Sequence, residues 1–301
     1  MQKGRVIQST GSWYLVDTGN EIIESRLPGR FRLNKKKETN PIAVGDWVDF
    51  TLNDDGTGNI ETIHVRDNYI TRQATHGKKG EQILIANLDQ ACVVVSIKQP
   101  TLKEGFIDRF LVTCEAYEVK PVIIVNKMDL AKSGGIQFAE DLRELYTSLG
   151  YTFHTTSIED EKSLKKLKHI LKDKISAFIG PSGVGKTSLI NAIDTSYNLK
   201  VVEVSDFSNK GKHTTTYARL IPLSFGGYIA DTPGIREFGL VNIEPWELSL
   251  FFPEMLEPRE HCQYSNCTHA HEPKCGVAEA FEAGEIAASR YNSYLNMLDS
   301  L

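Results

Sequence analysis

The stretch Gly180-Pro-Ser-Gly-Val-Gly-Lys-Thr187 decides how the rest of this sequence is interpreted. It fits G-x-x-x-x-G-K-[ST], follows the apolar run 176–179 and precedes the helical pattern 188–193. A strand, a glycine-rich turn and a helix in this order aim several backbone N–H groups and the positive end of the helix at one phosphate chain. An unliganded glycine-rich turn is the alternative, and such a match arises by chance in roughly one chain in a hundred of this length. The flanking strand and helix favour phosphate binding.

Two side chains of this motif have expected chemical roles. Lys186 should reach the β- and γ-phosphates and assist catalysis, and the Thr187 hydroxyl should bind Mg²⁺. The other residues expected to contact the nucleotide in this stretch are Gly180, Pro181, Ser182, Gly183, Val184, Gly185 and Ser188.

The composition is that of an ordinary globular chain with room for two or three domains in 301 residues. An odd count of five cysteines, with no apolar run of signal-peptide or membrane-spanning length, indicates a reducing cytoplasm and no membrane partner. The net charge is −5, so any contact with nucleic acid must come from local basic patches.

Residues 1–70 read as short strands separated by turns. The β-rich pieces are 6–7, 13–16, 21–23, 46–50 and 60–63. About five strands in so short a segment predict a small β-barrel of the OB type, with an SH3-like barrel as the alternative.

A basic loop interrupts this first domain. Residues 26–37 carry six positive charges and no acid. A solvated loop is one interpretation; the other is that the loop neutralises RNA phosphates and stacks an aromatic ring on a base. The RNA-contacting residues would be Arg30, Phe31, Arg32, Lys35, Lys36 and Lys37.

Residues 71–240 form the second predicted domain, which begins after a polar linker at 68–79. Apolar strands at 91–97, 121–125 and 152–154 alternate with helices at 107–117, 138–149 and 161–175, the last of them rich in lysine. This alternation predicts an α/β domain whose parallel sheet is covered on both faces. Gly226-Gly227 predicts a two-residue hairpin turn between later strands.

A guanine-binding motif follows the strand 121–125. In Asn126-Lys127-Met128-Asp129 the carboxylate can accept two hydrogen bonds from guanine, and ligands gather at the carboxyl ends of strands in α/β sheets. Ser157, in the loop after the next strand, is expected to back the base. GTP and GDP are therefore the expected ligands.

Two further segments complete the predicted site. Asp231-Thr-Pro-Gly234 offers a carboxylate for Mg²⁺ through water and an N–H for the γ-phosphate. The polar segment 211–216 lies where a switch threonine belongs, with Thr215 placed between the alternatives Thr214 and Thr216. Because the guanine motif precedes the phosphate loop and D-x-x-G comes last, the order predicts a circularly permuted GTPase domain.

Residues 241–301 are predicted to form a mostly helical zinc-binding domain. Three cysteines and one histidine, Cys262, Cys267, His269 and Cys275, would fill a closed tetrahedral structural site for one Zn²⁺. Reduced surface cysteines are the alternative, and His261 and His271 are weaker ligand candidates.

These motifs resemble one family, the circularly permuted, ribosome small subunit-dependent GTPases of the RsgA or YjeQ type. The resemblance extends over nearly the whole chain and includes Ala86-Asn-Leu-Asp-Gln90 before the first sheet strand. It implies a cytoplasmic factor, expected to be a monomer, that binds the small ribosomal subunit and 16S rRNA late in assembly and hydrolyses GTP there. A GTPase acting on the large subunit and an RNA-binding protein that only senses GTP remain the alternatives.

The residue after the D-x-x-G motif is Ile235, where many GTPases have a glutamine that orients the attacking water. Slow intrinsic turnover is therefore expected. His213 in the switch segment is the candidate for positioning the water, and a solvent-exposed loop histidine is the alternative.

Overall fold

The structure is a computed structural model, and it describes residues 1–10, 12–28, 41–73, 81–196, 218–231 and 243–301. The chain divides into two compact units, which are described separately. The first comprises residues 1–91, 165–179 and 190–237; the second comprises 92–164, 180–189 and 238–301. Within the described residues, no helix is both long and apolar enough to cross a membrane.

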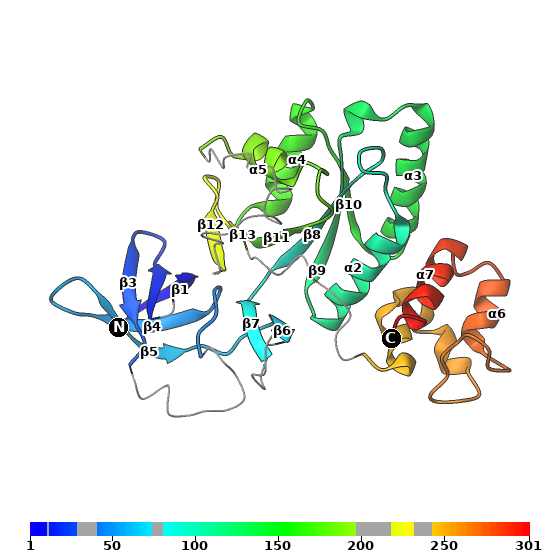
Figure 1. Ribbon diagram of the computed structural model, residues 1–301, viewed down its shortest axis with the longest axis horizontal. Helices are drawn as coiled ribbons and strands as arrows, with labels where there is room; N and C mark the ends of the chain where they lie inside the picture. Colours follow the sequence, from blue (N-terminus) through cyan, green and yellow to red (C-terminus); the bar gives the residue numbers. More distant parts are fainter. Residues whose placement is uncertain (11, 29–40, 74–80, 197–217, 232–242) are drawn as a thin grey trace, which may run out of the picture. The chain divides into compact units, whose positions relative to one another are not determined.

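The first unit begins with a closed five-stranded barrel (Figure 1). Its strands are β1 Gln2–Ser9, β2 Trp13–Asp17, β3 Ile22–Arg26, β4 Trp47–Leu52 and β5 Gly58–Ile63. The pairing runs β1-β2-β3-β5-β4 and closes from β4 back to β1, with only β3 and β5 parallel among these pairs. Alternate residues such as Val16, Val48 and Ile60 point into the core and are fully buried. The predicted OB-type barrel is confirmed.

The predicted linker at 68–79 is wrong in its first half, because a β-hairpin begins there. Strands β6 Tyr69–Gln73 and β7 Glu81–Ala86 pair antiparallel, with Ile70 opposite Ile85. Both isoleucines are buried. Two β-branched residues with a buried face therefore outweigh the polar character that suggested a linker.

The barrel continues by hydrogen bonding into the strands of the α/β domain that belong to the same unit. β11 Ile175–Ile179 is parallel to β13 Tyr228–Asp231, and β12 Arg219–Pro222 is antiparallel to β13. On its other side β12 pairs with β1, at Gln8 opposite Arg219. The Tyr228 hydroxyl also donates to Asp17 Oδ2 at 2.8 Å.

The turn between β12 and β13 is longer than the predicted two residues. It spans Leu223 to Gly227, and the Ser224 N–H donates to Asp194 Oδ2 at 2.6 Å. Gly226 and Gly227 both have positive φ, as their pairing predicted. A side chain at Gly227 would also place its Cβ 2.6 Å from the carbonyl oxygen of Lys174. The glycines are thus required, but the loop that contains them also serves to bind Asp194.

The second unit contains the strands of the guanine motif and the helices beside them (Figure 1). β8 Gln90–Ser96, which begins in the first unit, β9 Lys120–Asn126 and β10 Thr152–Thr155 are neighbours in the order β10-β9-β8, and β9 and β10 are parallel. The helices are α2 Glu104–Ala116 and α3 Ser133–Ser148. The alternation of strands and helices confirms the predicted α/β domain.

Two helices connect the units, and two helix boundaries differ from those predicted. α4 spans Glu161–Leu171 and α5 spans Lys186–Ile193. α3 starts five residues before its predicted beginning, because its first turn contains Gly134 and Gly135 and resembles a loop in the sequence. α4 ends before its predicted end at residue 175, because Asp173 takes a left-handed backbone conformation with φ of 58°.

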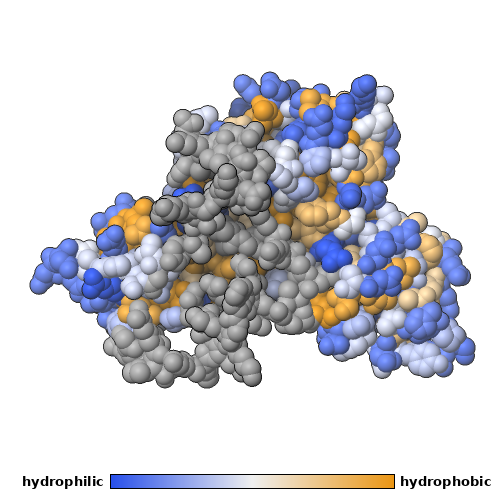
Figure 2. All heavy atoms as spheres, in the orientation of Figure 1, coloured by the Kyte–Doolittle hydropathy of each residue, from blue (hydrophilic) through white to orange (hydrophobic). Residues whose placement is uncertain are grey.

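The C-terminal part of the second unit is mostly helical, as predicted. Three short 3₁₀ helices, η4 Pro245–Phe251, η5 Pro253–Met255 and η6 Pro258–His261, each begin with a proline, whose fixed φ suits the first helical position. Helices α6 Gly276–Glu282 and α7 Ala288–Leu298 follow. Their shared core includes Leu248, Phe252, Met255, Val277 and Tyr294. The face of these helices seen in Figure 2 is mainly hydrophilic, with scattered hydrophobic residues.

A buried ionic network joins this helical part to α2. The Arg290 Nη1 atom donates to Asp108 Oδ1 at 2.6 Å, and its Nε donates to Glu254 Oε1 at 2.6 Å. The Tyr146 hydroxyl donates to the same Asp108 oxygen at 2.8 Å. The Arg290 side chain is fully buried. Because a charge buried in this way is stable only with its partners, the network fixes α7 and η5 against α2.

Candidate nucleotide and metal sites

The phosphate loop between β11 and α5 has a backbone that only glycine can adopt. Gly180 has φ of 152°, and a Cβ there would lie 2.1 Å from the carbonyl oxygen of Val94. Gly185 has φ of 90°, and a Cβ there would lie 2.7 Å from the Asn126 amide nitrogen. The glycines of the motif therefore let this loop pass directly over β8 and the end of β9.

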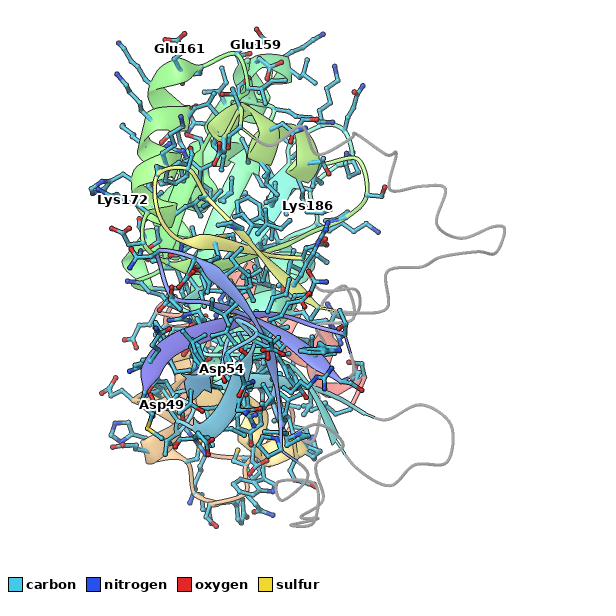
Figure 3. The ribbon with its side chains drawn as sticks, turned by 90° about the vertical axis from the view of Figure 1, so that its left-hand side faces the viewer. Asp49, Asp54, Glu159, Glu161, Lys172 and Lys186 are labelled. Atoms are coloured by element: carbon cyan, nitrogen blue, oxygen red, sulfur yellow. The ribbon has the colours of Figure 1, made fainter. Side chains whose placement is uncertain are left out.

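Lys186 is the first residue of α5, and its ammonium group folds back over the loop. Its Nζ donates to the carbonyl oxygens of Gly180 at 2.7 Å and Pro181 at 2.9 Å. Lys186 is labelled in Figure 3 at the start of this helix. Thr187 and Ser188 follow in the first turn and are half-buried. A cation and the N-terminus of a helix thus meet at one loop, which suits an anionic ligand.

The guanine motif is tied to this loop by two hydrogen bonds. Asn126, at the end of β9, donates its side-chain N–H to the Val184 carbonyl at 2.9 Å. Lys127 has a left-handed backbone, and its Nζ donates to the Gly183 carbonyl at 2.6 Å. The fold therefore brings together two motifs that lie more than fifty residues apart in sequence.

Asp129 is exposed beside this junction, and Ser157 orients it. The Ser157 hydroxyl donates to Asp129 Oδ1 at 2.5 Å and accepts from the Glu159 N–H at 3.1 Å. Met128 N donates to the Thr156 carbonyl at 3.2 Å, which joins the two loops through their backbones. The predicted base-backing loop therefore lies against the predicted guanine acceptor.

Asp231, the first residue of the D-x-x-G motif, belongs to the first unit and ends β13. Its Oδ2 accepts from both Nε and Nη2 of Arg219 at 2.8 Å. Sequence reasoning did not single out Arg219; its position at the start of the strand that follows the switch segment was the available signal. The other predicted residues of this region, His213, Thr214, Thr215, Thr216, Gly234 and Ile235, lie outside the described residues, as do Arg30, Phe31, Arg32, Lys35, Lys36 and Lys37 of the barrel loop.

The four predicted zinc ligands converge, with ligand atoms that all lie within 4.8 Å of one another. His269 Nδ1 lies 3.4 Å from Cys262 Sγ and 3.3 Å from Cys275 Sγ, and the two sulfurs are 3.8 Å apart. A tetrahedral zinc ion with ordinary bond lengths would separate its ligands by roughly 3.5 Å for N and S and roughly 3.8 Å for two sulfurs. All five cysteines are free of disulfides. The residues therefore fit a closed Zn²⁺ site.

The surroundings of the cluster favour metal binding through Nδ1 of His269. Its Nε2 lies 3.0 Å from the Ser249 hydroxyl on η4, and the Tyr291 hydroxyl donates to its backbone carbonyl at 2.6 Å. Burial, with a contribution from Arg259, lowers the pKa of His269 to about 4, so the ring stays neutral as a ligand must. Ser249 carries no sequence signal, because only the fold places it beside the ring.

Glu272 organises the loop that carries His269. Its carboxylate accepts hydrogen bonds from the N–H and hydroxyl of Thr268, at 2.7 and 2.6 Å, and from the N–H of Ala270 at 3.2 Å. Burial alone would raise the pKa of Glu272, but these hydrogen bonds, chiefly those from Thr268, outweigh it and lower the pKa to about 2.

Together, the guanine motif before the phosphate loop, the D-x-x-G aspartate after it and the parallel strands that carry them define a GTPase of circularly permuted order. The chain belongs to the RsgA GTPase family, whose model matches residues 63–241, while the model of the RsgA N-terminal domain matches residues 3–60.

Named relatives and solved structures agree with this membership. The chain is 46% identical over 298 residues to a small ribosomal subunit biogenesis GTPase RsgA of Phocaeicola vulgatus, covering 99% of this chain and 96% of that one. The corresponding protein of Flavobacterium johnsoniae is 44% identical over 300 residues, covering 98% and 92%. The crystal structure of YjeQ from Thermotoga maritima superposes with a TM-score of 0.82 at 37% identity, covering 100% and 98%. YloQ, described as a circularly permuted GTPase, superposes with a TM-score of 0.79 at 32% identity, covering 100% and 94%.

Proposed function

We propose that this chain binds the small ribosomal subunit during its late maturation and hydrolyses GTP to GDP and phosphate there, with turnover stimulated by the subunit. The hydrogen bonds from Asn126 and Lys127 to the phosphate loop carry the proposal, because they make the guanine and phosphate motifs one site. The relatives named as small ribosomal subunit biogenesis GTPases support the choice of partner.

In this proposal Asp129 accepts the donors of guanine and Ser157 holds it in place. Lys186 leaves the carbonyls of Gly180 and Pro181 for the β- and γ-phosphates, and the backbone N–H groups of the loop bind phosphate oxygens. Thr187 ligates Mg²⁺ directly, Asp231 does so through water, and Thr215 completes the shell. His213 positions the attacking water, because Ile235 has no group that can do so.

The remaining parts of the chain bind and orient the factor. Cys262, Cys267, His269 and Cys275 hold one structural Zn²⁺, which stabilises the C-terminal domain. The basic barrel loop, with Phe31, contacts 16S rRNA. We place the domains at 1–70, 71–240 and 241–301, and the protein acts in the cytoplasm as a monomer.

The test is GTP turnover by the purified chain alone, with purified small subunits and with purified large subunits. Stimulation by small subunits only is the expected result. Stimulation by large subunits only would make the chain a large-subunit factor. Binding of GTP without turnover under any of the three conditions would make it a GTP-sensing RNA-binding protein.

A further inference from the structure

Helix α4 presents a basic face that the nucleotide and zinc sites do not use. Leu164, Leu167 and Leu171 are buried and fix the orientation of the helix. The side chains on its other face are exposed: Lys162, Lys165, Lys166, His169 and, just after the helix, Lys172. Figure 3 shows Lys172 at the outer edge of this helix, among side chains that point away from the ribbon.

This face is locally positive in an acidic chain. Residues 161–174 contain six lysines and two acidic residues, a charge of +4, although the whole chain carries −5. Two of these lysines have roles in the fold: Lys168 lies over the Phe225 ring, and Lys174 donates to Gln90 Oε1 at 3.2 Å. Within the described part of the chain, Lys162, Lys165, Lys166 and Lys172 form no ion pair with an acidic side chain.

The stability of the helix does not account for this pattern. The helix dipole favours cations in the last turn, which suits Lys168, but it disfavours Lys162 in the first turn. Lysines three and four residues apart, such as Lys162 with Lys165 and Lys166, repel each other on the helix surface. A helix that needed only solubility would carry acidic residues among them, so the face is built at some cost to its own stability.

We propose that the exposed lysine face of α4 binds the phosphate backbone of RNA, as a contact separate from the barrel loop; its assignment to ribosomal RNA rests on the proposed function. The face offers lysines and one histidine, with no arginine or amide side chain to read base edges, which suits sequence-independent contact with phosphates. At the helical rise, Lys162 and Lys172 are about 15 Å apart along the axis, enough to meet several phosphates of one strand.

The test compares two pairs of exposed lysines that are changed identically. The variant Lys165→Gln/Lys166→Gln removes two charges from the α4 face with residues that favour helix. The control Lys103→Gln/Lys120→Gln removes two exposed charges elsewhere in the second unit. The probe is protein-free RNA extracted from small ribosomal subunits, titrated by filter binding between 50 and 200 mM salt, salt levels at which phosphate contacts are roughly separable.

The α4 variant should bind on the order of tenfold more weakly than wild type at the lowest salt, and the slope of log affinity against log salt should fall by about two. The control should match wild type in both. Equal melting temperatures and equal basal GTP turnover establish that both variants are folded.

An α4 variant that binds RNA like the control would overturn the proposal and leave α4 a solvated surface. Weaker binding to intact subunits with unchanged binding to extracted RNA would also overturn it, because the partner would then be an acidic protein. Neither outcome depends on stimulated GTP turnover, which tests the proposed function separately.

Discussion

At the scale of single residues, Asp129 is held by Ser157 through one oxygen while the side chain stays exposed to a ligand. Asp129→Asn replaces an acceptor with a donor. Preference should therefore shift from GTP toward xanthosine triphosphate, which carries a carbonyl where guanine carries its 2-amino group. Competitive filter binding of the two nucleotides measures this shift. GTP affinity equal to wild type would remove Asp129 from the base pocket.

Arg219 and Asp231 form the second informative pair at this scale. Because the guanidinium neutralises the carboxylate proposed to hold Mg²⁺ through water, it should compete with the ion. Arg219→Gln should lower the Mg²⁺ concentration that half-saturates GTP binding by up to about fivefold, the limit expected for an exposed ion pair. The control is Arg109→Gln, which removes a contact to Ser300 far along the chain from the motif. An unchanged Mg²⁺ titration would show that the pair does not influence the metal.

At the scale of elements, the network around Arg290 joins α7, η5 and α2. Arg290→Met should destabilise the protein by about 3–5 kcal/mol, because it leaves Asp108 and Glu254 buried without a cation. Urea unfolding measures the loss. The triple variant Asp108→Asn/Glu254→Gln/Arg290→Met should recover part of it, since no buried charge remains. If Arg290→Met alone is as stable as wild type, water must reach the two carboxylates.

The elements also show which features the sequence could predict. The phosphate loop, the guanine motif and the zinc ligands were recognisable because each is a short run with its own turn chemistry. The β6–β7 hairpin was missed because Ile70 and Ile85 become a buried pair only when strands distant in sequence meet. Arg219 beside Asp231 and Ser249 beside His269 were missed for the same reason, since each pairing depends on tertiary packing.

At the scale of the whole molecule, the zinc site stabilises one part of the chain and leaves the nucleotide motifs to their own contacts. The purified protein should contain about one zinc per chain. Cys267→Ser should lose the metal and unfold mainly the C-terminal part, while GTP binding is largely kept. Elemental analysis and a nucleotide titration on the same sample provide the measurement.

The matched control for this experiment is Cys114→Ala, which changes a buried cysteine of α2 outside the cluster and should keep the zinc. A wild-type protein without zinc, prepared with no chelator, would contradict the metal site. Loss of GTP binding in Cys267→Ser would show that the C-terminal part supports the nucleotide motifs through α2.

The Arg290 network also has a consequence for how the chain is made. Asp108 and its partner Arg290 are 182 residues apart, so during synthesis α2 emerges long before the cation that neutralises it. Domains fold as they leave the ribosome, N-terminal parts first. The acid of α2 must therefore stay hydrated until α7 arrives, and its final packing cannot precede the last stage of translation. A nascent chain stalled before residue 290 would expose this unpaired acid and the apolar surface around it. Such a chain would be a substrate for chaperones or proteases even though its nucleotide motifs were already complete.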